Sequence, residues 1–223
     1  MTQARILVAE GLGTALLLAI VVGSGIMAEQ LAQGNIALAL LANALATGTG
    51  LVVLIWCFGG ISGAHFNPAV TWVCYWQQQL NAKQALSYSI VQLIGAVLGV
   101  WLAHAMFNQP ILMLSNHERT GFGQYVSEFV ATFGLIMVII ATSRQQPKIT
   151  PMAVALYIVS AYWFTASTSF ANPAVTVART LTDTFAGIRP VDAPLFICSQ
   201  LIAAKSSQVF SDWLWPKQIG RAS

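Results

Sequence analysis

The amino-acid sequence predicts an all-α membrane protein with six transmembrane helices and two re-entrant half-helices in an inverted repeat. Three observations support this fold class. Of the 223 residues, 57% are hydrophobic and only 8% are charged, a composition typical of a chain surrounded by lipid. The pentapeptide Asn-Pro-Ala-Val-Thr occurs twice, at residues 67–71 and 172–176. The segments on either side of each copy are also repeated.

Length and hydrophobic runs give the number of spans. About 20 apolar residues cross a bilayer, so the chain has room for about six spans. We place them at residues 6–28, 36–58, 85–107, 125–141, 152–164 and 193–204. The first span contains Glu10 and is longer than the apolar core of a signal peptide, so we interpret it as a retained helix rather than a cleaved leader.

Each pentapeptide predicts the start of a short helix. Asparagine is a good N-cap, and proline fits the first turn because its missing N–H would be unpaired there. Asn67 and Asn172 are therefore the expected caps, followed by Pro68 and Pro173. Irregular backbone at membrane depth is tolerated only within protein or beside a watery cavity. Two such half-helices in corresponding positions predict a binding or conduction site near the bilayer midplane.

The internal repeat extends to the surrounding helices. The matched segments are residues 9–14 with 127–132, and 92–95 with 200–203. Residues 1–223 are thus expected to form one membrane domain with repeats at about 1–107 and 120–216. Each repeat reads as helix, helix, half-helix, helix, and an odd number of spans places the second half upside down. The two half-helices should therefore meet, amino end to amino end, at the centre.

The distribution of charge predicts the orientation. With the amino terminus inside, the cytoplasmic positions are Arg5, Lys83, Arg144, Lys148, Lys217 and Arg221, and the outer ones are Arg119, Arg179, Arg189, Glu29, Glu118, Asp183 and Asp192. This is a positive-inside bias, so we expect both termini in the cytoplasm. The inside loops account for the formal charge of +3, which gives no indication of nucleic-acid binding.

The sequence offers little support for catalysis. It shows no serine, histidine and carboxylate constellation, no glycine-rich phosphate loop and no metal-ligand spacing. We expect no enzyme activity, no cofactor and no metal. Cys57, Cys74 and Cys198 are odd in number and lie in or beside apolar segments, which predicts buried free thiols.

These motifs resemble those of the aquaporin superfamily. The resemblance rests on Ser-Gly-Ala-His-Phe-Asn-Pro-Ala-Val at 62–70, Phe-Ala-Asn-Pro-Ala at 170–174, and the glutamates Glu10 and Glu128. It covers the chain up to about Ala204. The runs at 161–172 and 178–188 look like those of bacterial aquaglyceroporin-like channels associated with arsenic resistance. The resemblance implies a passive channel for small neutral solutes and water, acting as a homotetramer in the bacterial inner membrane.

The resemblance also implies which residues line the pore. The pore centre would comprise Asn67, Pro68, Ala69, Asn172, Pro173 and Ala174. The selectivity filter would be lined by Thr47, Ser169, Val175 and one residue of the fifth helix. That residue is Tyr162 if the helix is aligned on Pro151, or Ser160 if it is aligned on Asn172.

The filter departs from the family pattern at Val175. Aquaporins generally carry an arginine directly after the second Asn-Pro-Ala, whereas Arg179 comes four residues later, about one helical turn nearer the outer mouth. There Arg179 would attract anions or be a solvated mouth residue. Because the filter residues Thr47 and Ser169 are also small, we infer a wide filter that admits glycerol-like polyols, urea, ammonia, undissociated arsenous acid and methylated arsenicals.

Three other functions stay open. In a water-selective aquaporin, Arg179 would move into the filter. In a non-conducting structural membrane protein, Tyr162 or Phe170 would close the pore. A coupled transporter would need an embedded ion site beyond Glu10 and Glu128.

Several polar residues at membrane depth have an expected structural role. We expect Glu10 and Glu128 to bind the loops that carry the half-helices, with proton relay as the alternative. His65 should make a loop-packing hydrogen bond, with a pH gate as its alternative. Lys205 follows an apolar segment that is too short to span, and a lysine near the bilayer centre costs about 2.5–3.5 kcal/mol. Either the helix continues with Lys205 snorkelling or facing protein, or the carboxyl terminus is altered.

Overall fold

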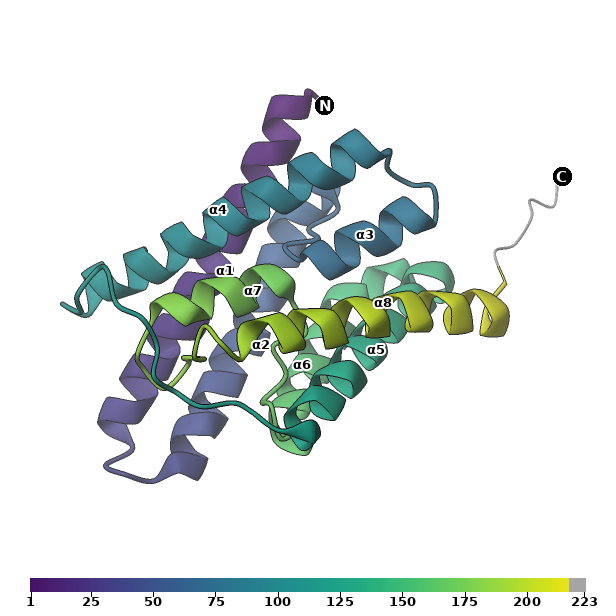
Figure 1. Ribbon diagram of the computed structural model, residues 1–223. Coiled ribbons are helices and arrows are strands. Elements are labelled where there is room, and N and C mark those ends of the chain that lie inside the picture. Colours follow the sequence, from purple (N-terminus) through teal and green to yellow (C-terminus); the bar gives the residue numbers. More distant parts are fainter. Residues whose placement is uncertain (217–223) are drawn as a thin grey trace, which may run out of the picture.

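The computed structural model describes residues 1–216 and, over that range, contains helices and loops but no strand (Figure 1). The α-helices are α1 (Gln3–Leu31), α2 (Ile36–Ser62), α3 (Pro68–Trp76), α4 (Ala82–Met106), α5 (Phe122–Gln145), α6 (Thr150–Phe164), α7 (Pro173–Ala178) and α8 (Ala193–Leu214). Two 3-10 helices, Pro147–Ile149 and Arg179–Leu181, flank α6 and α7. The all-α prediction is confirmed. The predicted cytoplasmic residues Lys217 and Arg221 lie outside the described residues.

Within residues 1–216, four helices, α1, α2, α4 and α5, are long and apolar enough to cross a membrane by length and composition alone. Most are a few residues longer than the predicted spans. Asn35 caps α2 at its predicted start, and the capping box of Asn81 with Gln84 begins α4 before its predicted start. Helix α6 has 15 residues, close to its predicted range of 152–164.

The two short helices begin as the sequence predicts. Asn67 caps α3 by accepting a 2.8 Å hydrogen bond from the Ala69 N–H, and Asn172 caps α7 by accepting bonds from the Ala174 and Val175 N–H groups. A proline follows each cap in the first turn. Such a cap stabilises a helix by about 1 kcal/mol. It also leaves each asparagine with its side-chain oxygen committed to the backbone.

Helices α1 and α4 approach each other closely because α4 carries glycines on the contact. A Cβ atom at Gly95 would overlap the carbonyl oxygen of Gly11, and one at Gly99 would overlap that of Ala15. Small residues allow such close backbone contact in membrane helices. In the second half, α8 packs on α5, and the Ser207 hydroxyl donates a 2.7 Å hydrogen bond to the Phe133 carbonyl.

Helix α8 is longer than the predicted span of residues 193–204, because it continues to Leu214. The Lys205 ammonium donates a 2.8 Å hydrogen bond to the Gln208 side chain and lies 5.0 Å from the centroid of the Trp76 ring. Farther along, Asp212 forms an ion pair with Arg144 of α5. Polar groups in the last turns are thus held by neighbours, and the expectation of a continuing helix is the one that agrees with the structure.

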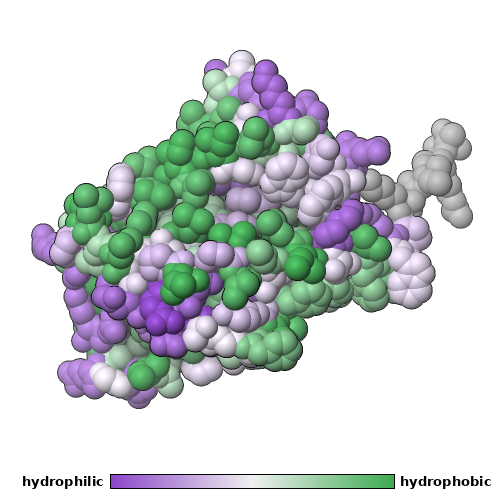
Figure 2. All heavy atoms as spheres, viewed as in Figure 1, coloured by the Kyte–Doolittle hydropathy of each residue, from purple (hydrophilic) through white to green (hydrophobic). Residues whose placement is uncertain are grey.

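The outside of the bundle is largely apolar. Figure 2 shows hydrophobic residues over much of the visible face, and residues such as Leu98, Leu156 and Ile202 are more than half exposed on single helices. The prediction of buried thiols was wrong for two cysteines: Cys57 and Cys198 are exposed on this outer surface, while Cys74 is partly buried, and all three are free. Their apolar surroundings are the surface itself, which the sequence pattern does not distinguish from the interior.

Candidate functional site

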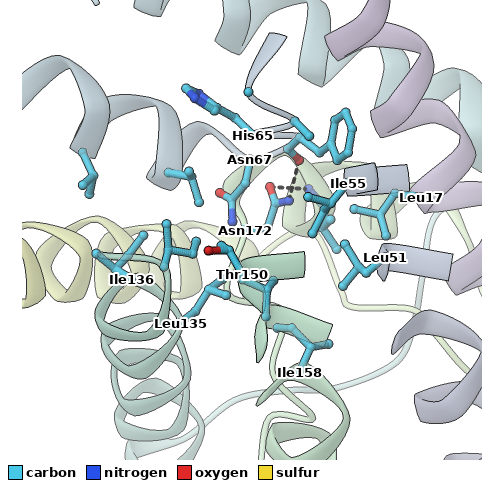
Figure 3. Close-up of a pocket in the computed structure, with 18 of the residues that line it drawn as sticks. Leu17, Leu51, Ile55, His65, Asn67, Leu135, Ile136, Thr150, Ile158 and Asn172 are labelled. Carbon is cyan, nitrogen blue, oxygen red and sulfur yellow. Dashed lines mark hydrogen bonds between the residues drawn. The ribbon is translucent and has the colours of Figure 1, made fainter. Parts of the chain in front are cut away.

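A cavity of about 520 Å³ runs through the middle of the bundle. Residues from both halves line it, and Figure 3 shows the Asn67 and Asn172 carboxamides beside each other within it. Much of the remaining wall is aliphatic and includes Leu17, Leu51, Ile55, Leu135, Ile136 and Ile158. The cavity also reaches Gln77, Ser143 and Arg144 at one end and Ser169, Val175 and Arg179 at the other. It is therefore a long, mostly apolar passage with polar groups at the centre and the ends.

Each central asparagine donates a hydrogen bond to the loop that precedes the other half-helix. Asn67 Nδ2 donates to the Ala171 carbonyl, and Asn172 Nδ2 donates to the Phe66 carbonyl, each at 2.8 Å. A carboxamide nitrogen has two hydrogens, and these bonds use one of each pair. Both oxygens accept from the helix backbone, and each carboxamide keeps one N–H that these bonds do not use. The centre of the passage thus offers two hydrogen-bond donors to an oxygen atom.

Glu10 holds the loop before α3. Its carboxylate accepts hydrogen bonds from the backbone N–H groups of His65 and Phe66, at 3.0 and 2.8 Å. It also accepts from the Ser62 hydroxyl at 2.6 Å and from Gln92 Nε2 at 2.8 Å. Four donors compensate for the burial of one carboxylate that is fully inaccessible to solvent.

Glu128 does the same for the loop before α7. It accepts from the Phe170 and Ala171 N–H groups, both at 2.9 Å, and from Gln200 Nε2 at 2.6 Å. These loops need such support because their backbones include non-glycine residues with positive φ, namely Ala64, Phe66, Thr168, Ser169 and Ala171. Neither carboxylate lines the cavity. In this geometry, both carboxylates bind the backbone of the loops that carry the half-helices.

His65 lies at the cavity wall, with its ring anchored on α3. Its Nδ1 is 3.1 Å from the Thr71 hydroxyl, and its Nε2 is 3.6 Å from the Cys74 sulfur. Its backbone N–H is the one bound by Glu10. Both ring nitrogens are thus engaged by α3, an arrangement suited to loop packing.

The residues expected to form the filter come together at one end of the cavity. Thr47 of α2 and Tyr162 of α6 both line it, and their hydroxyl oxygens are 3.2 Å apart. Ser169 and Val175 line the same region. Ser160 is exposed on the other side of α6, where its hydroxyl donates to the Tyr157 carbonyl. Of the two fifth-helix alternatives, Tyr162 is therefore the one that faces the cavity.

Arg179 is not a solvated mouth residue. It is 3% exposed, its Nε donates to the Ala186 carbonyl, and its Cζ is 3.4 Å from the centroid of the Phe170 ring. Arg179 also lines the cavity. The burial of Arg179 could not be predicted from the sequence pattern, because the chain after α7 turns into a 3-10 helix and a folded loop that brings Ala186 back to the arginine.

Arg119 is a second buried arginine that sequence reasoning did not assign to the site. It lies in the loop between α4 and α5, 5.0 Å from the Phe170 ring centroid. Its Nε donates to the Gly187 carbonyl and one terminal nitrogen to the Ser167 carbonyl, at 2.8 and 3.2 Å. The loop is tied further by Asn116, whose two hydrogen bonds hold the pKa of Asp183 below its usual range and keep that carboxylate charged. No local sequence pattern indicates these long-range contacts.

The residues described do not form a metal site. Across positions 1–216, no group of three or more His, Cys, Asp or Glu side chains is placed to hold a metal ion. What the site presents is a lined passage with fixed hydrogen-bonding groups.

The family model of the major intrinsic proteins matches residues 1–165. The chain belongs to the major intrinsic protein family. Members of this family, the aquaporins and aquaglyceroporins, are membrane channels and not enzymes. The chain is therefore a multi-pass membrane protein, and the recognition of the aquaporin superfamily from the two Asn-Pro-Ala motifs is confirmed.

Individual relatives agree with this assignment. The chain is 52% identical over 207 residues to aquaglyceroporin AqpS of Rhizobium meliloti (strain 1021), a match that covers 93% of this chain and 88% of the relative. It is 32% identical over 150 residues to aquaporin PIP2-7 of Arabidopsis thaliana, covering 65% of this chain and 53% of that protein. The X-ray structure of the aquaglyceroporin from Plasmodium falciparum has the same fold, with a TM-score of 0.69 and 19% identity over 95% of this chain and 96% of the other.

Proposed function

We propose that this protein is a passive channel for small uncharged solutes of the size of glycerol, with some passage of water. The observation that carries the proposal is the composition of the cavity. Asn67 and Asn172, each with one N–H that the loop bonds leave unused, line a passage whose other walls are largely aliphatic. Such a wall favours the passage of an uncharged solute that can exchange a few of its hydrogen bonds with water for hydrogen bonds with the protein.

The filter end supports solutes larger than water. Val175 stands where an arginine narrows many aquaporins, and Ser169 contributes a buried hydroxyl for which residues 1–216 provide no hydrogen-bond partner. A buried hydroxyl without a partner is unfavourable unless water or a permeant supplies one. Ser169 and the hydroxyls of Thr47 and Tyr162 thus supply several polar contacts for a polyol. The name of the 52% identical relative, an aquaglyceroporin, points the same way.

Positive groups oppose the passage of cations. The amino ends of α3 and α7 meet at the cavity centre, where each contributes partial positive charge. The guanidinium of Arg179 adds a full charge at the filter end. Neutral solutes escape this barrier because they have no net charge to be repelled.

We extend the proposal to urea, ammonia and undissociated metalloids such as arsenous acid and methylated arsenicals, because each is small and neutral. Assembly as a homotetramer in a bacterial inner membrane, with both termini cytoplasmic, belongs to the same proposal. So do the assignments of the pore centre, the filter and the two structural glutamates. The burial of Arg179 beside the filter keeps the water-selective aquaporin as the second candidate.

Stopped-flow light scattering of proteoliposomes tests the proposal. Vesicles containing the protein should shrink fast in an inward glycerol gradient and then reswell fast, whereas a sucrose gradient should give shrinkage alone. Empty vesicles are the control. Fast shrinkage without reswelling would favour the water-selective candidate. Rates equal to those of empty vesicles would favour a non-conducting protein, and uphill accumulation of solute would favour a coupled transporter.

A further inference from the structure

A groove on the outside of the bundle, between α3 and α8, combines two tryptophans with a lysine. It has a volume of about 440 Å³ and is lined by Trp72, Trp76, Leu201, Ile202, Lys205 and Ser206. Helices α3 and α8 run beside each other on the face turned toward the viewer in Figure 1. None of these six residues lines the central cavity. The groove is therefore a separate feature that conduction does not explain.

The positive charge of Lys205 is held in place but not neutralised. Its Nζ donates to Gln208 Oε1 at 2.8 Å and lies 5.0 Å from the Trp76 ring centroid. Within residues 1–216, no carboxylate lies within 4.0 Å of it. An unpaired ammonium on an apolar outer surface is unfavourable in hydrocarbon and reaches toward the lipid headgroups.

The direction of the side chain fixes which membrane face it approaches. Gln208 is one turn nearer the carboxyl end of α8, and the ion pair of Asp212 with Arg144 lies one further turn along. At 1.5 Å per residue, the Lys205 backbone is about 10 Å from the level of Asp212. Because the Lys205 side chain extends toward Gln208, its ammonium is closer to the level of Asp212 than its backbone is. The two tryptophans beside it are the residues that prefer the interface between headgroups and acyl chains.

We propose that this groove binds one anionic phospholipid from the leaflet at the carboxyl end of α8. The phosphate would pair with Lys205, and an acyl chain would lie against Trp72, Leu201 and Ile202. If both termini are cytoplasmic, this is the cytoplasmic leaflet, which carries the anionic lipids that attract basic groups.

Charge complementarity favours a lipid over a second copy of the chain. The protein has seven acidic residues. Glu10 and Glu128 are fully buried, and Asp212 is paired with Arg144. The other four lie at the opposite end: Glu118 and Asp192 pair with Arg189, Asp183 binds Asn116, and Glu29 is near the end of α1 that packs against Phe185. A second copy therefore offers no carboxylate at the depth of Lys205, whereas a phospholipid offers a phosphate.

Native mass spectrometry of the full-length protein tests this inference without measuring flux. The protein is titrated with dioleoyl phosphatidylglycerol and, separately, with the zwitterionic phosphatidylcholine of the same chains. The wild type should retain phosphatidylglycerol preferentially. Lys205→Met should lower that preference about fivefold, the effect of one basic residue near an anionic surface. Lys205→Arg should keep it, and so should Lys148→Gln, which removes a cation outside the groove.

Two results would overturn the inference. One is a wild type that retains both lipids equally. The other is a Lys205→Met variant with the preference of the wild type, and a changed number of subunits in that variant would identify the groove as a contact between copies. Removing a lipid-exposed charge should not impair folding, so either result can be read from an intact protein.

Discussion

The Arg179 guanidinium lies against the face of Phe170, with its Cζ atom 3.4 Å from the ring centroid. Its Nε is bound to the Ala186 carbonyl, and no carboxylate within residues 1–216 lies within 4.0 Å of it. The charge is therefore fixed at the cavity wall while the position directly after Asn-Pro-Ala is the small Val175. We infer that this chain separates two tasks: Val175 leaves the filter wide, and Arg179 keeps a positive charge beside it.

Arg179→Leu should weaken the exclusion of cations while glycerol flux is kept or increased. A unit charge about 8 Å from a cation in the passage, at an effective dielectric constant of about 20, changes the energy of that cation by about 2 kcal/mol, so the cation leak should rise by about thirtyfold. Sodium entry into proteoliposomes, followed with an indicator dye, measures this. Arg189→Gln removes an outer-loop charge that already pairs with Glu118 and Asp192, and it should leave the leak unchanged. Equal leaks in both variants would refute the assignment.

Tyr162→Phe should alter glycerol flux because it removes the hydroxyl that lies 3.2 Å from the Thr47 hydroxyl in the cavity wall. A hydrogen bond of this kind contributes about 0.5–1.5 kcal/mol. Glycerol permeability should change about two- to tenfold while water permeability changes less. Ser160→Ala is the matched control, since that hydroxyl is exposed on the other side of α6. A larger effect of Ser160→Ala would assign the filter to Ser160.

Glu128→Gln should destabilise the fold and lower flux together. The amide keeps the shape of the carboxyl group but turns one acceptor oxygen into a donor that faces N–H groups. One of the Phe170 and Ala171 amides then loses its partner, at a cost of about 1–3 kcal/mol. Thermal unfolding in detergent measures the loss, with the exposed Glu29→Gln as the control. An unchanged melting temperature with altered proton flux would instead support a proton relay.

Gly99→Ala should loosen the contact between α1 and α4. The new methyl group would overlap the Ala15 carbonyl and crowd Leu18, and overpacking of this kind costs about 1–3 kcal/mol. Gly60→Ala adds the same methyl group within α2 where no atom lies within 4 Å, so it should be neutral or slightly stabilising. The free energy of unfolding in a denaturing-detergent titration compares the two. Equal values would show that this contact does not need glycine.

Local chemistry made much of the fold predictable. The Asn-Pro pairs at 67–68 and 172–173 combine a preferred N-cap with a preferred first-turn residue, and both half-helices begin there. Glu10 and Glu128 are hard to bury unless they meet several donors, and each binds the loop of the half-helix in its own half. In these cases the residue type and the membrane environment leave few structural solutions.

Other features of the structure could not be predicted from local sequence patterns. The apolar run after Ala193 ends at Lys205, but its continuation depends on Gln208 and on Trp76 from α3. The burial of Arg179 depends on a loop that returns Ala186 to it. Cys57 and Cys198 lie on an apolar surface that a sequence pattern does not separate from a core. Each of these outcomes is set by tertiary contacts, by the path of a folded loop or by lipid, none of which a local sequence pattern shows.

The most direct measurement compares wild type with Val175→Arg in proteoliposomes under matched glycerol and sucrose gradients. If Val175 leaves the filter wide, the arginine should lower glycerol permeability by more than about tenfold, because a charged side chain then stands among Thr47, Ser169 and Tyr162. Water efflux in sucrose should fall far less, and Val175→Leu should lie between the two. If Val175→Arg leaves glycerol permeability unchanged, Arg179 already sets the width of the filter, and the account of a wide solute pore is wrong.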